Sequence, residues 1–541
     1  MLFSAEAGFL DTSGFTGLQI GDCIYYYRGV FFMRGRKAGR DSILAFAQEF
    51  ETSGVPPYAK AFGAFSCAIA RPTGETIFFT DNSNLNCFYV ASDAIGDSFL
   101  ELIRYEHSSA FDDDALCEFL GLGDVFFGKT LVGGISLSAS DSTYVCSGGV
   151  LRREHKGVGD IDAPTAIDSV VDFFGDVADA LSDERVTLSL TGGYDSRLVF
   201  ACLRDRLPLS VFISCSDERA PDVYWARRAA HAGGATLEIV NVAKPQVSEA
   251  YIRHLFDSAD GLVPFADDSY MRISAFMQDR RDVGYTCYLT GDGGPRHKDW
   301  YWLQDFPFYR MRHTNLGRFY DQRIQVVRTL VPVGDRLHDP YRKMRPRMIQ
   351  SMRQHVKSIN TESYDSIGFH ILGEMVKPKF TTYSKLVPLY APLWELELVR
   401  YSFHLPRRER FFYNSMRKVT TAQSKAVART PTVYGTTASS EARYLARDVL
   451  FQGIDYSRRA MRLLGRTVLH RNLFVGLAST WSAEADVRNM DLSRRAVAYC
   501  VRQGLIRGGT VTSDVPYAVL GRMIQLYLLG EWLDASIPDA S

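Results

Sequence analysis

The sequence predicts a chain of the α/β plus α+β class, with an N-terminal β-sandwich, a doubly wound parallel-sheet domain and a helical C-terminal part. Three observations support this class. Short apolar runs separated by turn residues fill residues 1–155, strand and helix patterns alternate from about residue 163, and helical patterns dominate after about residue 340. The length of 541 residues also favours two or three domains over a single core.

The first 155 residues have the pattern of a β-rich domain. Apolar and aromatic runs such as Val30–Met33, Phe65–Ala70 and Thr76–Thr80 alternate with turns rich in Gly, Pro, Asp and Asn. Helical spacing occurs at Asp41–Glu51 and Asp113–Leu120. We therefore place a first domain at residues 1–155.

The pattern then changes to alternating helices and strands. The expected elements are a helix at Ala163–Leu181, a strand at Val186–Leu190, a helix at Ser196–Arg204, a strand at Leu209–Ser214, a helix at Asp222–Ala232 and a strand at Thr236–Val242. Such alternation is typical of a parallel sheet covered by helices on both faces. It predicts a second domain at residues 156–440 and a helical extension at 441–541.

The composition excludes several classes of protein. No apolar run approaches the roughly 20 residues of a membrane-spanning helix. The nine cysteines form no CxxC pair, and no Cys/His group has zinc spacing. The first residues lack the basic flank and small-residue cleavage site of a secretory signal. We expect a cytoplasmic protein of enzyme size with reduced thiols and no membrane contact.

Charge is distributed unevenly along the chain. Residues 1–180 contain 12 Lys and Arg against 25 Asp and Glu, a net charge of −13, so the remainder carries +13. The basic part either handles anions such as phosphates, or it attracts the acidic part, or its charges are simply solvated. The arginine-rich segment 308–357 could bind an anionic substrate, a carrier protein or a nucleic acid, but solvated helix faces are the commoner explanation, so a nucleic acid partner is not expected.

A formal Walker A match spans Gly123 to Thr130 and includes Lys129. This motif binds phosphate only when a strand enters the loop and a helix leaves it. Here a helical pattern precedes the loop and a glycine-broken strand pattern follows it. A nucleotide hydrolase built on Lys129 is therefore the least favoured hypothesis.

A second glycine loop has the right context, because the apolar strand VTLSL enters it and a helix leaves it. Its glycines, Gly192 and Gly193, permit close approach of a ligand to the backbone. The hydroxyls of Thr191 and Ser196, together with N–H groups at the helix start, form an anion-binding nest. Asp195 could cap the helix or hold a phosphate-bound magnesium ion, and the residues leave both alternatives open.

The segment Thr191–Ser196 resembles the SGGxDS loop of the ATP pyrophosphatase group. Within that group the chain resembles the asparagine synthetase superfamily, which includes β-lactam synthetases and lasso-peptide cyclases, over about residues 1–440. Gly63–Ile69, Phe78–Asp81 and Phe88–Tyr89 resemble its N-terminal glutaminase domain, an Ntn-type β-sandwich. Lys129–Ile135 resembles an element of the same domain, which makes the Walker match a coincidence.

The synthetase half carries further matches at Pro221-Asp222, Leu289–Gly294, Val387–Pro392 and Leu405-Pro406. The resemblance implies ATP and Mg²⁺ as cofactors. The implied contacts are Ser189 and Ser214 for adenine, Thr191, Gly192, Gly193 and Ser196 for the phosphates, Thr290 and Gly291 for the ribose and α-phosphate, Asp195 for Mg²⁺, and Asp292 as a base or orienting group.

Several positions depart from the family pattern. Residue 2 is Leu, where the family has its nucleophilic cysteine, so glutamine hydrolysis is not expected. Pro295 and Arg296 replace an acidic pair that would supply a second magnesium ligand, and Asp299 is a nearby substitute. The pyrophosphate-binding lysine is also missing at its place, and Lys425 is the nearest catalytic replacement, with Arg429 beside it.

The resemblance implies a ligase that adenylates a carboxylate with ATP and joins it to an amine or to ammonia. We expect small-molecule or peptide carboxylate and amine substrates, and a homodimer or a biosynthetic partner protein as the candidate assemblies. A nucleotide-binding scaffold or sensor that has lost turnover is the alternative. It is supported by Pro295, Arg296 and Thr432, which occupy positions where the family has charged residues.

Overall fold

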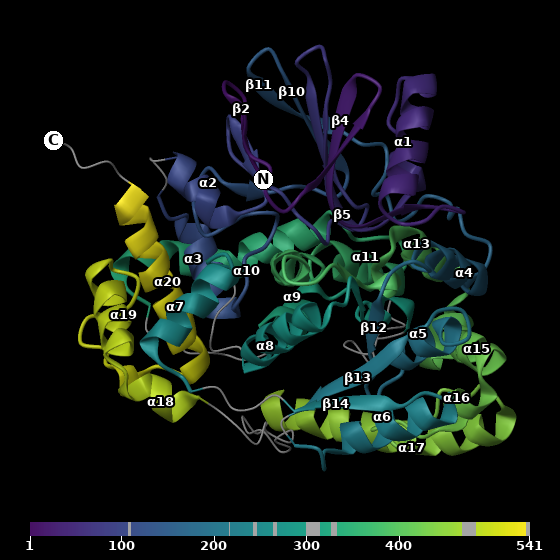
Figure 1. Ribbon diagram of the computed structural model, residues 1–541. Coiled ribbons are helices and arrows are strands. Elements are labelled where there is room, and N and C mark those ends of the chain that lie inside the picture. Colours follow the sequence, from purple (N-terminus) through teal and green to yellow (C-terminus); the bar gives the residue numbers. More distant parts are fainter. Residues whose placement is uncertain are drawn as a thin grey trace.

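The computed structural model describes residues 1–106, 110–215, 217–241, 246–262, 268–298, 314–325, 333–467 and 483–536. Two antiparallel sheets form its N-terminal part, and a parallel sheet with flanking helices follows (Figure 1). The expected order, with antiparallel sheets first and a parallel sheet second, is therefore observed.

The larger antiparallel sheet has six strands in the order β11-β10-β6-β5-β4-β3. Its strands are β3 (Thr16–Ile20), β4 (Cys23–Met33), β5 (Ala61–Ala70), β6 (Thr76–Thr80), β10 (Ser142–Ser147) and β11 (Val150–His155). The smaller sheet has the order β2-β1-β8-β7-β9. Its strands are β1 (Leu2–Ser4), β2 (Gly8–Asp11), β7 (Tyr89–Val90), β8 (Ala94–Gly96) and β9 (Ser136–Leu137).

Aromatic side chains fill the space between and beside these sheets. Phe3, Phe78 and Phe88 belong to a buried cluster that joins the two sheets. Helix α1 (Arg40–Ser53) packs its buried Phe46 over the other face of the larger sheet, against Phe31. Strands that are apolar on both faces explain why the sequence shows continuous apolar runs here.

The parallel sheet has the order β14-β13-β12-β15-β16, and all of its neighbouring strands are parallel. Its strands are β12 (Val186–Ser189), β13 (Ser210–Cys215), β14 (Leu237–Asn241), β15 (Cys287–Leu289) and β16 (Leu389–Tyr390). The helices among them are α4 (Val170–Ala180), α5 (Asp195–Leu203), α6 (Pro221–Ala232), α7 (Glu249–Ser258), α8 (Asp268–Val283), α9 (Leu316–Phe319), α10 (His338–Arg353), α11 (Asn360–His370) and α12 (Lys377–Ser384).

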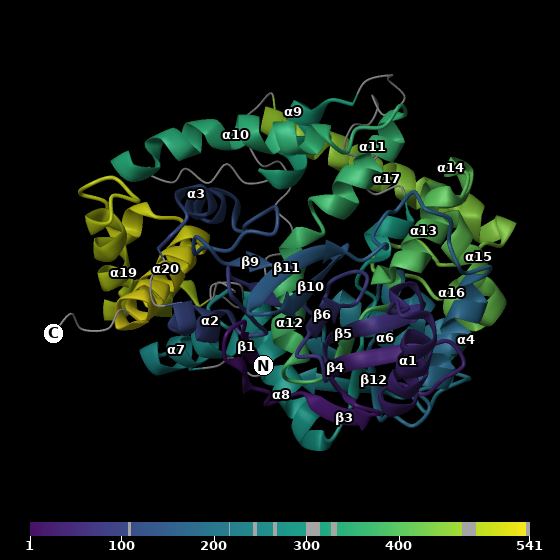
Figure 2. The same cartoon turned by 90° about the horizontal axis from the view of Figure 1, so that it is seen from above.

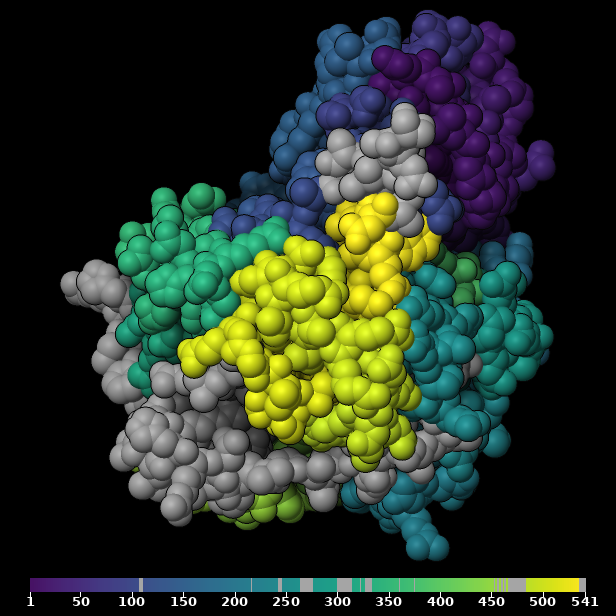
Figure 3. Space-filling view, turned by 90° about the vertical axis from the view of Figure 1, so that its left-hand side faces the viewer, coloured from purple at the N-terminus to yellow at the C-terminus, as the bar shows by residue number. Residues whose placement is uncertain are grey.

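Helices predominate after β16, as the sequence predicts. They are α13 (Leu396–His404), α14 (Arg407–Arg410), α15 (Asn414–Gln423), α16 (Lys425–Arg429), α17 (Ala442–Thr467), α18 (Glu484–Asn489), α19 (Asp491–Arg502) and α20 (Tyr517–Ser536). Helices α19 and α20 lie with α2 (Phe99–Glu106) and α3 (Asp113–Leu122) at one end of the molecule, away from α15 and α16 (Figure 2). The same C-terminal helices form the surface below the N-terminal sheets in Figure 3.

The first helix of the second domain differs most from its expected bounds. The helix expected from Ala163 begins only at Val170, because Pro164 precedes it and the Ser169 hydroxyl caps it by accepting the Val171 and Asp172 N–H groups. The strand expected at Thr236–Val242 is observed at Leu237–Asn241, and Val242 lies outside the described residues. Within the described ranges, no helix is long and apolar enough to cross a membrane.

Candidate functional site

The parallel sheet places two loops at its topological switch point. From β12 the chain proceeds outward through β13 and β14, and it then returns to the other side of β12 with β15 and β16. The loops that follow β12 and β15 therefore flank one crevice at the carboxyl edge of the sheet. Ligands bind at this place in open α/β sheets.

The loop after β12 is held in a fixed shape by its own side chains. The Thr191 N–H donates to the Ser196 hydroxyl at 3.0 Å, and the Gly193 N–H donates to the Thr191 hydroxyl at 3.2 Å. The Gly192 N–H donates to the Asp222 carboxylate at 2.9 Å. The loop is thus preformed. Asp222 at the start of α6 supports it, and in the sequence this residue stands out only through the Pro221-Asp222 motif match.

Helix α5 begins at Asp195, and no side chain caps its N-terminus. Of the two roles that the sequence leaves open for Asp195, the helix cap is therefore not observed. The first N–H groups of a helix lack partners within the helix, and the helix dipole adds positive potential there. This end of α5 is consequently suited to an anion such as a phosphate.

Glycines allow the two loops to pack directly against each other. A Cβ atom on Gly291 would lie 2.3 Å from the Ser196 nitrogen, and one on Gly294 would lie 2.0 Å from the Asp195 carboxyl carbon. A Cβ on Gly192 would meet Val433 at 2.6 Å. Close approach of neighbouring segments of the same chain explains these three glycines, since any side chain would push the segments apart.

The predicted adenine-binding positions lie at the same edge of the sheet. Ser189 is the last residue of β12 and pairs with Phe212, whereas Ser214 lies near the end of β13 and pairs with Val240. Both serines are half-buried. The structure thus brings Ser189 and Ser214 to the edge that carries the glycine loop.

Thr290 and Asp292 shape the second loop. The Thr290 hydroxyl donates to the Asp292 carboxylate at 2.8 Å. Solvent reaches Asp292, yet the surrounding protein desolvates its carboxylate and raises its pKa, and the negative charge of Asp195 raises that pKa further. A carboxylate with a raised pKa in a crevice fits the predicted role of a base or orienting group.

A lysine occupies the immediate surroundings of Asp195. The Lys298 ammonium lies 3.3 and 3.2 Å from the two Asp195 carboxylate oxygens. The charge of Asp195 also contributes to raising the pKa of the buried Tyr413 phenol, after burial itself. No local sequence pattern indicates Lys298, because its partner is 103 positions away in the chain.

The described residues do not form a magnesium site built from protein ligands alone. The predicted ligand Asp195 is already paired with Lys298, and Pro295 and Arg296 supply no carboxylate. Among the described residues, no group of three or more His, Cys, Asp or Glu side chains could hold a metal ion. The proposed substitute Asp299 lies outside the described residues.

The structure does not bring Lys425 to the glycine loop. Lys425 is exposed at the start of α16, and the neighbouring Val427 packs near Gly233 at the C-terminal end of α6. Asp222, which contacts the loop, lies at the other end of this helix, about 16 Å from Gly233. Arg429 is engaged instead by Glu441, at 2.7 Å from its Nε.

The segment after α16 nevertheless returns to the loop. The Val433 N–H donates to the Gly192 carbonyl at 3.1 Å. The fully buried Arg197 guanidinium donates to the carbonyls of Thr430 and Pro431, the latter at 3.1 Å. Uncharged residues therefore occupy the place where the resemblance implies a lysine.

The Walker A match is not a phosphate loop. Gly123 ends helix α3 in a left-handed conformation, with φ of 95°. The Lys129 ammonium pairs with Asp112 at 3.3 Å, and the Thr130 hydroxyl donates to the carbonyls of Val132 and Ile135. The pocket beside this loop holds about 40 Å³, which is too small for a nucleotide.

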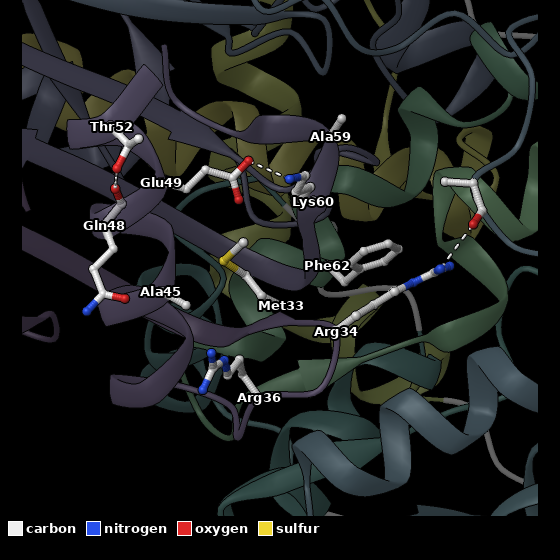
Figure 4. Close-up of a pocket in the computed structure, with 11 residues that line it drawn as sticks. Met33, Arg34, Arg36, Ala45, Gln48, Glu49, Thr52, Ala59, Lys60 and Phe62 are labelled. Atoms are coloured by element: carbon white, nitrogen blue, oxygen red, sulfur yellow. Dashed lines mark hydrogen bonds and ion pairs between the residues drawn. The ribbon is translucent and has the colours of Figure 1, made fainter. Parts of the chain in front are cut away.

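A larger cleft of about 670 Å³ lies elsewhere, between α1 and the ends of β4 and β5 (Figure 4). Lys60 in this cleft pairs with Glu49 at 2.5 Å, and Arg34 donates to the Ala166 carbonyl at 3.0 Å. The cleft belongs to the antiparallel sheets and contains none of the predicted site residues. It is therefore separate from the nucleotide-site candidate.

Comparison with known protein families agrees with this geometry. A parallel sheet with a glycine loop and an uncapped helix at its switch point is consistent with an α/β domain of the ATP-pyrophosphatase type. Residues 177–430 match the family model of asparagine synthase. The chain therefore carries an asparagine synthase family domain over these residues, and domains of this family use ATP. No curated protein matches the chain significantly.

Proposed function

We propose that the protein is an ATP-dependent ligase that adenylates a carboxylate and joins it to an amine or to ammonia. The observation that carries this proposal is the preformed loop Thr191–Ser196 at the uncapped start of α5, inside an asparagine synthase family domain. Thr191, Gly192, Gly193 and Ser196 would hold the phosphates, and Thr290 and Gly291 would line the ribose side.

The proposed reaction has two steps. A carboxylate oxygen attacks the α-phosphorus of ATP, and the bond to the β-phosphate breaks with release of pyrophosphate. The amine nitrogen then attacks the acyl carbon and expels AMP, and the amine proton passes to a base. Asp292 is the candidate for this proton transfer because its carboxylate lies in the crevice with a raised pKa. No step is assigned to a metal held by the protein.

We also propose that the N-terminal sheets, which resemble the Ntn-type glutaminase domain, do not hydrolyse glutamine. Burial raises the pKa of the Cys67 thiol and raises that of Cys117 to about 12. The pKa values of the Cys23 and Cys146 thiols are raised for the same reason. Thiols in this state are poor nucleophiles. Purified protein incubated with glutamine and ATP is expected to release no ammonia, and steady ammonia release would contradict the proposal.

The ligase proposal is tested by pyrophosphate release with ATP, Mg²⁺ and pooled carboxylic acids and amines. Ser196→Ala removes the hydroxyl that accepts from the Thr191 N–H and is expected to lower the rate by about 10- to 100-fold. Lys129→Ala, in the Walker A match, is the matched control and is expected to retain the rate. Loss of nucleotide binding in Lys129→Ala with retention in Ser196→Ala would overturn the assignment.

A nucleotide-binding scaffold or sensor is the second candidate function. The pairing of Asp195 with Lys298 and the position of Lys425 away from the loop favour it, because both depart from the expected catalytic set. The same assay separates the two candidates. ATP binding without pyrophosphate release on any pool supports the scaffold, and release on any pool supports the ligase.

A further inference from the structure

The ion pair between Lys298 and Asp195 stands at the head of α5, where the glycine loop ends. The Lys298 ammonium is within 3.3 Å of both carboxylate oxygens and lies 5.1 Å from the centre of the Tyr413 ring. The side chains are only partly exposed, 18% for Lys298 and 25% for Asp195. The lysine is therefore part of the crevice and not a freely solvated surface charge.

The backbone that carries Lys298 is fixed on both sides. The imidazole of His297, which is fully buried, contacts the Ser402 hydroxyl at 2.6 Å and the Leu393 carbonyl at 2.7 Å. The Arg410 guanidinium donates to the Arg296 carbonyl at 2.9 Å and to the Lys298 carbonyl at 3.4 Å. These anchors direct the Lys298 side chain to the start of α5, so its position is built into the fold.

The neighbouring Arg296 side chain lies in a different environment. It is 4% exposed, and its guanidinium carbon lies 3.2 Å from the centre of the Trp394 ring. Arg296 is thus packed into the protein interior, whereas Lys298, two residues later, reaches Asp195. Among the described residues of this loop, Lys298 is the one that delivers positive charge to the crevice.

Electrostatics requires a cation at this position. A bound triphosphate at the head of α5 would lie beside the carboxylates of Asp195 and Asp292, which already interact with each other. Like charges at such distances repel unless a cation compensates them. We propose that the Lys298 ammonium is this cation, and that it neutralises Asp195 and contacts the phosphates of ATP in place of a protein-held magnesium ion. This inference rests on the proposed nucleotide site.

The test measures the dissociation constant of α,β-methylene-ATP by calorimetry, once in MgCl₂ and once in EDTA. For the wild type, the two values are expected to agree within about threefold. Lys298→Met removes the ammonium and is expected to weaken binding in EDTA by about tenfold or more, as for loss of a charge-assisted contact. Binding of this variant should recover in MgCl₂, since Asp195 is then free to bind the metal. Lys298→Arg keeps the charge and should retain binding in EDTA.

Lys385→Met is the matched control. Lys385 pairs with Asp260 at 3.2 Å, the same distance as the Lys298 pair, but it precedes β16 and so lies toward the opposite edge of the sheet. Its loss should change neither value, and the melting temperature of each variant reports on folding.

Two results would overturn the role of Lys298. One is wild-type binding that weakens tenfold or more in EDTA, and the other is a folded Lys298→Met variant that binds equally well in both buffers. Absence of wild-type binding in both buffers would overturn the nucleotide site as well. Lysine-dependent binding without any pyrophosphate release would support the role of Lys298 while rejecting the ligase.

Discussion

Gly294 shows at the residue scale how little space separates the two loops of the site. Because a Cβ at this position would lie 2.0 Å from the Asp195 carboxyl carbon, Gly294→Ala must displace Asp195 or the backbone. We expect a loss of about 1–3 kcal/mol in the free energy of unfolding, as for overpacking, together with weaker ATP binding. Denaturant unfolding and a nucleotide titration measure the two effects.

Gly453→Ala is the control for this substitution. Gly453 lies inside α17, and no atom comes within 4 Å of a Cβ placed on it. Alanine is expected to raise stability there by about 0.5–1 kcal/mol because it favours the helix. Equal effects of the two substitutions would mean that Gly294 does not contact Asp195 closely.

Tyr194 connects the glycine loop to distant helices at the scale of elements. Its hydroxyl contacts Thr436 and accepts a hydrogen bond from the Arg417 guanidinium of α15 at 3.1 Å. Arg417 in turn donates to Asp448 of α17 at 2.9 Å, and both residues of this pair are at most 1% exposed. The start of α5 is thus positioned by helices more than two hundred residues later in the chain.

Asp448→Ala is expected to destabilise the protein by about 3–5 kcal/mol, because it leaves the Arg417 charge buried without its carboxylate. The Thr437 N–H would lose its acceptor as well. The exposed pair of Arg494 and Asp491 on α19 provides the comparison, and Asp491→Ala should cost less than about 1 kcal/mol. Urea unfolding followed by tryptophan fluorescence tests both values, and similar costs would show that burial does not govern the Arg417 pair.

These connections mark the limit of what the sequence predicts at this scale. The strand VTLSL, the two glycines and the following helix are local patterns, so β12, the loop and α5 could be placed correctly. The contacts of Tyr194, Arg197 and Lys298 depend on partners 103 or more positions away, and no local pattern encodes such pairs. Of the two roles that the sequence leaves open for Asp195, the cap is not observed, and its partner Lys298 lies in another loop.

At the scale of the whole molecule, buried polar contacts join the N-terminal sheets to the parallel-sheet domain. The Ser83 hydroxyl donates to the Trp394 carbonyl at 2.5 Å, and the Cys87 N–H donates to the Thr381 hydroxyl at 2.9 Å. Glu395 stands at the centre of this contact, because its Oε1 accepts from the Gly63 N–H at 2.6 Å and from the Tyr390 hydroxyl at 3.0 Å. Specific hydrogen bonds therefore cross the domain boundary that the sequence predicts near residue 155.

Burial raises the pKa of Glu395 to about 8, and the negative charge of Asp81 contributes to this rise. The carboxyl is thus protonated in the folded protein at neutral pH, whereas in the unfolded chain it ionises near its ordinary value of 4.5. Between these values the folded state binds more protons, so the free energy of unfolding falls as the pH rises from about 5 to 8, by at most about 1.4 kcal/mol per pH unit. Above pH 8, Glu395 no longer contributes to the change of the unfolding free energy with pH.

Glu395→Gln isolates this effect, since glutamine keeps an acceptor oxygen for Gly63 and Tyr390 and carries no charge at any pH. We expect the difference in unfolding free energy between wild type and variant to move in favour of the variant as the pH increases from 5.5 to 8.5. Glu154→Gln makes the same change on the exposed strand β11 and should show no such trend. Urea unfolding at three pH values measures the difference, and a constant difference would mean that the two domains meet through an ordinary, ionised carboxylate.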